Sequence, residues 1–216
     1  MDKIRKDALS ELVYDKIKQM VLDEVLLPGQ KIAKGELAQT LGVSQTPVTE
    51  AINRLTGEGL IEQRVRQGFF VRVFTYEDLR DLFAVRAGME GIALRLSVEE
   101  LPPEKLDELT HYFDGFNLPM DEQAKLRYKK ADQAFHEHII SLSDNSFIIY
   151  FDRSFDFIMK SYQKGLIREP EETIDEHRQI VQAIRARDGR KAQELLMLHH
   201  LKSRNVICER HLKSQP

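Results

Sequence analysis

One aspartate and three histidines lie on the apolar faces of predicted helices, and these residues are the best suited to chemistry in the sequence. Asp132 and His136 fall one turn apart on one stripe, and His177 and His199 each fall on the stripe of a later helix. A carboxylate and imidazoles that point into a core are costly unless they pair or bind something. This donor set suits Zn²⁺, Ni²⁺ or a similar divalent ion. Hydrogen-bonded core residues would give the same pattern, and the spacing alone leaves both interpretations open.

Two further polar residues are candidates for binding a small effector. Arg86 shares the apolar face of its helix with Glu90, four residues later. The two could form a structural ion pair, or the planar guanidinium could meet a ligand carboxylate. Asn145 could line the same pocket or cap the next helix, and we favour the cap. The remaining histidines are predicted at the surface or at a rim: His111, His138, His200 and His211.

The helices that must position these residues fill the chain from Thr75 to its end. Thr75 and Asp78 have the spacing of a capping box, which opens the first helix, and no strand pattern follows. Breaks at proline, glycine and an Asp-Asn pair separate six helices. We expect these helices at 76–97, 103–115, 121–143, 145–165, 171–187 and 189–211. The boundary near Phe74 predicts two domains, residues 1–74 and residues 75–216.

Composition narrows the class of protein. The chain has 216 residues, of which 42% are hydrophobic and 31% charged, enough for helical cores. It has no apolar run that could span a membrane, no signal peptide and a single cysteine, Cys208, so we expect a cytoplasmic protein. The net charge is −3, and residues 1–74 carry eleven Lys or Arg against ten Asp or Glu. Any affinity for DNA must therefore come from local patches.

The first domain contains the pattern of a helix-turn-helix. Between Leu37 and Leu60, two short segments with helical periodicity flank Gly42, which can adopt the positive φ of a tight turn. Two β-type runs follow at 60–65 and 69–74, and a hairpin in that place is a wing. The predicted fold class is therefore mostly α, a winged helix-turn-helix followed by an all-helical bundle. The second helix would enter the major groove, and arginines at the wing tip would meet phosphate.

Residues 9–73 resemble the winged helix-turn-helix of the GntR family of bacterial transcription regulators. The resemblance rests on LLPGQKI, ELAQTLGVSQTPVTEAINRL, EGLIEQ and the wing glycine. It implies a homodimer on a two-fold symmetric, double-stranded DNA operator. The family usually has arginine at the positions of Gln45 and Thr49 and a basic residue at that of Gly35, so the operator should differ or the affinity should be lower. The residues predicted to contact DNA are Lys34, Ser44, Gln45, Thr46, Thr49, Arg54, Arg64, Arg66 and Gly68.

Residues 79–207 resemble the helical effector domain of the FadR subfamily, called FCD, and its six-helix, VanR-type branch in particular. The matching segments are LRDLFAVRAGMEGIAL, DQAFHEHIISLSDN, DEHRQIVQAIRARD and AQELLMLHH. Metal-binding members have their ligands at positions that match Asp132, His136, His177 and His199. The resemblance implies a divalent transition metal, zinc or nickel. It also implies a small carboxylate effector, such as a hydroxy acid, a sugar acid or an amino acid.

The sequence therefore predicts a ligand-responsive transcription regulator and not an enzyme. Two alternatives stay open. Three histidines, one aspartate and an open coordination position could activate water in a metal-dependent hydrolase, although no general base stands out beyond Glu137 or Glu176. The missing arginines would also fit a metal-binding or ligand-binding protein with a degenerate DNA-binding head.

Overall fold

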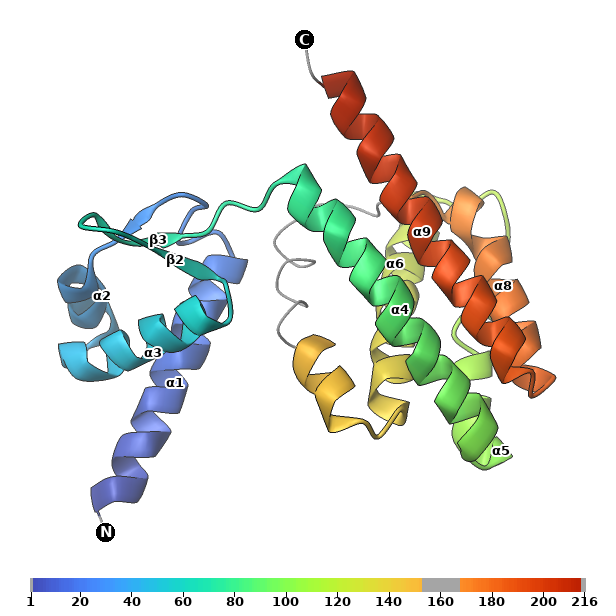
Figure 1. The fold of residues 1–216 in the computed structure, drawn as a ribbon, viewed down its shortest axis with the longest axis horizontal. Helices are drawn as coiled ribbons and strands as arrows, with labels where there is room; N and C mark the ends of the chain where they lie inside the picture. The colour runs from blue at the N-terminus through green and yellow to red at the C-terminus, as the bar shows by residue number, and fades with distance from the viewer. Residues whose placement is uncertain (1, 153–167, 215–216) are drawn as a thin grey trace. The chain divides into compact units, whose positions relative to one another are not determined.

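The computed structural model describes residues 2–152 and 168–214, and the chain divides into two compact units, Met1–Phe74 and Thr75–Pro216 (Figure 1). The division falls at the residue where the sequence predicted a domain boundary. The first unit is a small winged helix-turn-helix and the second is a helical bundle, which confirms the mostly α fold class. No helix in the described part of the chain is long and apolar enough to cross a membrane.

The N-terminal unit places a three-stranded antiparallel sheet beside three helices. Gly42 ends the second helix with a φ of +66°, which makes the tight turn into the third. The strands have the order β1-β3-β2. The first strand was not predicted, because two residues are too few to show a pattern, and the wing strands are shorter than expected. The elements are α1 (Asp2–Leu22), β1 (Lys31–Ile32), α2 (Lys34–Leu41), α3 (Gln45–Gly57), β2 (Ile61–Arg64) and β3 (Gly68–Val71).

The buried stripe of α3 determines which of its faces remains for DNA. Val48, Ile52 and Leu55 are fully buried, as their spacing predicted, and α1 contributes the fully buried Ile17. Helix α3 packs against α1 and α2. The polar residues at the start of α3 therefore stay on the solvent side.

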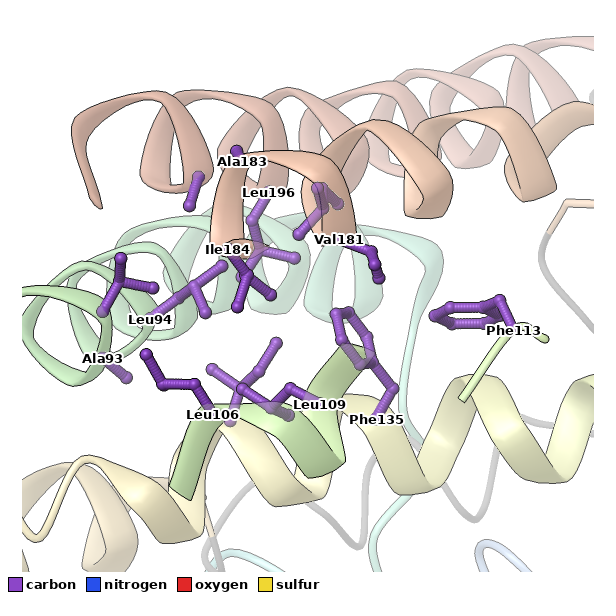
Figure 2. Packing of buried hydrophobic residues seen from close by; sticks show 14 of the residues in the cluster. Ala93, Leu94, Leu106, Leu109, Phe113, Phe135, Val181, Ala183, Ile184 and Leu196 are labelled. Carbon is purple, nitrogen blue, oxygen red and sulfur yellow. The ribbon is translucent and has the colours of Figure 1, made fainter. Parts of the chain in front are cut away.

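The C-terminal unit is a bundle in which α9 packs along α4 and also against α8, while α6 contacts α4 and α8 (Figure 1). Leu94 of α4, Phe135 of α6, Ile184 of α8 and Leu196 of α9 meet in one apolar cluster (Figure 2). This shared core fixes the four long helices relative to one another. They and the connecting turns are α4 (Tyr76–Glu100), α5 (Pro103–Asp107), a 3₁₀ turn (Glu108–Thr110), α6 (Glu122–Leu142), a helix that begins at residue 146, α8 (Pro170–Arg185) and α9 (Gly189–Ser214).

The helix expected over 103–115 is wrong as a single element. Leu106, Leu109 and Phe113 have helical spacing, but a short helix, a 3₁₀ turn and further turns deliver them to the core, and Gly115 has a φ of +78°. The helix expected over 145–165 begins at residue 146, and its part at 153–165 lies outside the described residues. The capping box at the start of α4 is confirmed.

Candidate metal centre and nucleic-acid interface

The four residues predicted as metal ligands come together from three helices. Helix α6 supplies Asp132 and His136, α8 supplies His177, and α9 supplies His199. One donor atom of each residue lies within 4.8 Å of the donor atoms of the other three. The three histidines are buried, while the side chain of Asp132 keeps 22% of its surface exposed. The stripes read from the sequence therefore converge on one place.

An imidazole nitrogen and a carboxylate oxygen face each other inside this cluster. His177 Nε2 lies 3.1 Å from Asp132 Oδ1, and His136 Nε2 lies 3.9 Å from the same oxygen. Yet His177 Nε2 is buried and has no hydrogen-bond partner of acceptable geometry among the described residues. A buried polar atom without a partner costs about 1–3 kcal/mol. A cation between these donors would remove that cost, and the donor set fits a divalent transition metal.

Burial lowers the pKa of two imidazoles in the cluster. It lowers the pKa of His177, and it lowers that of His199 well below the usual value, with positive charge on His177 acting in the same direction. Burial acts to raise the pKa of Asp132, but contact with His177 and the charges of the histidines outweigh it, so this pKa lies well below its usual value. At neutral pH the donors include an ionised carboxylate and neutral imidazoles, which is the protonation state that coordinates metal ions.

Each histidine of the cluster uses its other ring nitrogen, Nδ1, to contact a second polar group. These contacts fix the orientation of each ring and leave Nε2 directed away from the partner. The pairs are His136 Nδ1 with Glu90 Oε2 at 2.5 Å, His177 Nδ1 with Tyr128 Oη at 2.7 Å, and His199 Nδ1 with Glu176 Oε2 at 2.9 Å.

The three partner residues were not predicted in these roles, although two of them had a signal. Tyr128 lies on the same stripe as Asp132, one turn earlier, and its hydroxyl needs a partner once buried. Glu90 was placed on an inward face and is fully buried. Glu176 precedes His177 in sequence, and nothing in the helical pattern marks it.

Arg86 and Asn145 have structural partners. Arg86 Nε donates a hydrogen bond of 2.6 Å to Glu90 Oε1, so the ion-pair alternative holds in this structure. Asn145 Oδ1 accepts hydrogen bonds from the backbone N–H groups of Phe147 and Ile148. Asn145 is therefore the cap that we favoured, and its role as an effector contact loses support.

The prediction for His200 was wrong. Expected at a rim, it is only 1% exposed, and its Nε2 lies 2.8 Å from Glu90 Oε2. Helix α9 packs on α4 as well as on α8, so the face turned about 100° away from His199 is buried too. For the other histidines, His111 is exposed and His138 partly exposed, as expected, and the side chain of His211 lies outside the described residues.

In the N-terminal unit, exposed polar residues gather at the start of α3. Ser44, Gln45 and Thr46 are exposed, and Thr49 is half-buried. Gln45 Nε2 lies 3.4 Å from the position that a Cβ atom on Gly35 would occupy. A long basic side chain at position 35 would therefore compete with Gln45 for the same space.

Basic side chains also lie over the aromatic residues of the wing. Lys34 Nζ is 4.2 Å from the ring centroid of Phe69, and the guanidinium of Arg64 is 4.2 Å from that of Phe70. Arg64 also donates to Glu62 at 2.7 Å. These contacts place one cation over each of two successive residues of β3, whose side chains point to opposite faces of the sheet.

Arg66 and Gly68 form the turn of the wing, whereas Arg54 lies elsewhere. Arg66 is exposed with a φ of +60°, and Gly68 has a φ of +106°, which L-residues rarely adopt. The guanidinium of Arg54 donates to Glu11 at 2.6 Å and stacks 3.7 Å from the ring centroid of Tyr14, both on α1. Because its guanidinium is engaged there, Arg54 is the weakest of the predicted DNA contacts.

Comparison with known proteins agrees with a DNA-binding N-terminal unit and a helical C-terminal unit. Residues 9–71 match the bacterial regulatory proteins of the gntR family, and residues 81–203 match the FCD domain. The chain is a GntR-family regulator with an FCD domain. It is 36% identical over 130 residues to the Nta operon transcriptional regulator of Aminobacter aminovorans, covering 59% of this chain and 60% of that protein.

Other relatives of this GntR-family regulator match over nearly the full length. It is 26% identical over 205 residues to a probable D-xylose utilization operon transcriptional repressor of Paenarthrobacter nicotinovorans, covering 92% of this chain and 90% of that protein. The structure of E. coli McbR/YncC has a TM-score of 0.68 with 22% identity, covering 94% of this chain and 98% of that one. At that identity the structural likeness shows a shared fold. The protein is thus a DNA-binding transcription regulator of the GntR and FCD type.

Proposed function

We propose that this GntR-family regulator responds to a small carboxylate through a divalent transition metal held in its FCD domain. Asp132, His136, His177 and His199 would hold the metal, Zn²⁺ or Ni²⁺. The protein would then be a metal-binding member of the FadR subfamily, in its six-helix, VanR-like branch.

The unpaired nitrogen of His177 is the main support for a metal site. A buried polar nitrogen without a hydrogen-bond partner is uncommon and is often explained by a bound ion or water. Among the buried side chains that the structure describes, His177 Nε2 and His200 Nδ1 are in this state, and His177 Nε2 is the one that faces the carboxylate of Asp132. His177 uses only Nδ1, and its Nε2 faces the ionised Asp132 with no hydrogen bond between them. Two electron-rich groups in contact are stabilised by a positive ion, and His136 and His199 add two more nitrogen donors.

Arg86 supports a carboxylate effector near the metal. It is partly buried, with 15% of its side chain exposed, and its charge interacts with those of Glu90, Asp152 and Asp132. Its bond to Glu90 uses Nε, so Glu90 does not engage the two terminal nitrogens of the guanidinium. A carboxylate that completed the coordination of the metal could meet these nitrogens, which suit a two-oxygen ligand.

DNA binding would follow the mode that the helix-turn-helix implies. Two chains would form a homodimer in the cytoplasm, with one α3 in the major groove of each half-site. Two relatives are named as transcriptional regulators of operons, which supports control of an operon here as well. The effector could change DNA binding only through unequal affinity for two states of the dimer.

Metal content is the first property to test. We would measure it by mass spectrometry in purified wild type, in His177→Ala and in the matched control His111→Ala, whose imidazole is exposed. We expect about one equivalent in wild type and in the control, and none in His177→Ala. Equal metal in all three proteins would remove this site from consideration.

DNA binding is tested separately, by fluorescence anisotropy with the DNA upstream of the gene at several salt concentrations. A specific regulator should bind with a Kd of about 10⁻⁸ M or tighter in the presence of competitor DNA. Small carboxylates would then be screened for a change in that Kd. Weak binding that depends steeply on salt would instead favour a degenerate head.

A metal-dependent hydrolase is less well supported. Such an enzyme needs a general base placed beside the activated water. Glu137 is exposed and bonded to Gln133, and Glu176 is engaged by both Arg168 and His199. Neither carboxylate is placed to take a proton at the cluster.

A further inference from the structure

We propose that two acids outside the donor set, Glu90 and Glu176, are positioning residues for the metal site. Each would hold one histidine in the tautomer that offers Nε2 to the metal, and an arginine would hold each acid in place. This inference rests on the metal site proposed above. It assigns the affinity of that site in part to residues that do not touch the ion.

The first of these arrangements joins α4, α6 and α9. Arg86 Nε donates to Glu90 Oε1 at 2.6 Å, and Glu90 Oε2 lies 2.5 Å from His136 Nδ1. His200 Nε2 lies 2.8 Å from the same Oε2 and restricts the carboxylate from a third helix. Glu90 is fully buried and pairs with the guanidinium of Arg86, which stabilises its carboxylate in the charged form. An ionised carboxylate only accepts hydrogen bonds, so His136 must carry its proton on Nδ1.

The second arrangement repeats the first at another histidine of the cluster, His199. Arg168 donates two hydrogen bonds of 2.8 Å to Glu176, from Nη1 to Oε2 and from Nη2 to Oε1. Glu176 Oε2 in turn lies 2.9 Å from His199 Nδ1, and Lys202 Nζ donates to Oε1 at 2.8 Å. Because a carboxylate held by both an arginine and a lysine only accepts hydrogen bonds, His199 carries its proton on Nδ1.

The third histidine reaches the same tautomer through neutral groups. The Thr173 hydroxyl donates to the backbone carbonyl of Glu169, which leaves Thr173 Oγ1 to accept the bond of 2.8 Å from Tyr128. Tyr128 then has no proton left for His177, so its oxygen accepts from His177 Nδ1 at 2.7 Å. All three imidazoles therefore present the lone pair of Nε2.

The partners differ in what they do to the basicity of the imidazole. A carboxylate that accepts from Nδ1–H raises the electron density at Nε2 and strengthens its bond to a cation, whereas a phenol does so less. Loss of such a partner typically weakens metal binding about 10–100-fold. We therefore expect Glu90 and Glu176 to contribute to metal affinity through His136 and His199.

A second metal bound between Glu90, His136 and His200 is the competing explanation of the first arrangement, since their donor atoms also lie within 4.8 Å of one another. Their separations of 2.5 Å and 2.8 Å are those of hydrogen bonds, and Arg86 places a cation directly on Glu90. Both features favour a positioning carboxylate.

The test compares metal affinity in three isosteric variants of the full chain. Glu90→Gln and Glu176→Gln remove the charge, and Glu137→Gln is the matched control, because Glu137 is the exposed neighbour of His136. Competition with a chromophoric chelator, using Zn²⁺ as the probe, should show a Kd weakened about 10–100-fold in the first two and unchanged in the control. An unchanged Kd in both test variants would overturn the proposal, as would two equivalents of Zn²⁺ in wild type.

A second measurement does not depend on metal binding or on the folding of any variant. Long-range ¹H–¹⁵N spectra of metal-free wild type at pH 8 report which ring nitrogen carries the proton. We expect the Nδ1–H form for His136 and His199, and the Nε2–H form for either would overturn the proposal. If wild type binds no Zn²⁺ but shows the Nδ1–H forms, the proposed metal function fails while the positioning contacts stand.

Discussion

Replacing Asp132 by Asn should change the stability of the C-terminal unit in opposite directions with and without metal. At pH 8, His177 and His199 are neutral, because burial lowers the pKa of both. The carboxylate of Asp132 then faces the lone pair of His177 Nε2, which is 3.1 Å away and has no hydrogen-bond partner among the described residues. Asn has the same shape, no charge and an NH₂ group that can donate to this nitrogen.

Without metal, the gain from Asp132→Asn is that of one new hydrogen bond, about 1 kcal/mol. In a unit of about 140 residues this raises Tm by about 4 °C. With metal at 100 times its Kd, wild type gains about 2.7 kcal/mol, or about 10 °C. The variant lacks the single carboxylate of the donor set and should gain almost nothing. Asp132→Asn is thus expected to be more stable than wild type in chelator and less stable than wild type in Zn²⁺.

Scanning calorimetry at pH 8, with excess chelator or with Zn²⁺, measures both effects. Asp114→Asn is the matched control, because Asp114 also pairs with a histidine but at the exposed surface, where the substitution should change Tm little. If Asp132→Asn lowered Tm in chelator by about 4 °C, which corresponds to about 1 kcal/mol, Asp132 and His177 would be an ordinary ion pair. The unpaired lone pair inferred from the geometry would then not exist.

Three other outcomes are expected. Gln45→Arg should shift the preference at one operator base from adenine toward guanine by about 1–3 kcal/mol, measured by anisotropy on operators that differ at that base; equal binding to both would contradict a base contact. Arg66→Ala should weaken binding to all sequences and reduce the slope of log K against log salt by about 1, whereas Arg54→Ala should leave the slope unchanged because Glu11 already holds its guanidinium. In the metal-free protein, burial outweighs the attraction of Glu90 and lowers the pKa of His200 from 6.5 to about 4, so the unfolded chain binds a proton that the native chain excludes. Stability should therefore fall by up to about 3 kcal/mol as pH drops from 6.5 to 4, and urea unfolding at several pH values that showed no such fall in the wild type would contradict this.

Helical periodicity was sufficient to find the four clustered residues, because each lies on the stripe that its helix turns toward the core. Asp132 and His136 share one such stripe, and His177 and His199 lie on two others. A period identifies a face and gives no information about which helix that face meets. From the sequence, only the family resemblance indicated that the four residues form one site. The structure supplies the distances between them.

Helical periodicity did not predict the positions of His200 and Glu176. A single apolar stripe assigns one buried face to a helix, but α9 is buried on two sides, so His200 lies in the core beside its neighbour His199. Glu176 reaches across to a histidine of another helix, 23 residues later in the chain. No spacing within one helix encodes such a contact.

The ion pairs Arg86–Glu90 and Arg168–Glu176, which contact the histidines of the cluster, are not explained by the stability of the C-terminal unit alone. Two carboxylates and two arginines are held at low exposure, and exchanging a buried ion pair for well-packed apolar side chains of similar volume is often neutral or stabilising. In each pair the carboxylate also accepts a hydrogen bond from a histidine of the cluster. The geometry of Glu90 and Glu176 therefore makes physical sense as support for those imidazoles, and the two substitutions to Gln measure that support directly.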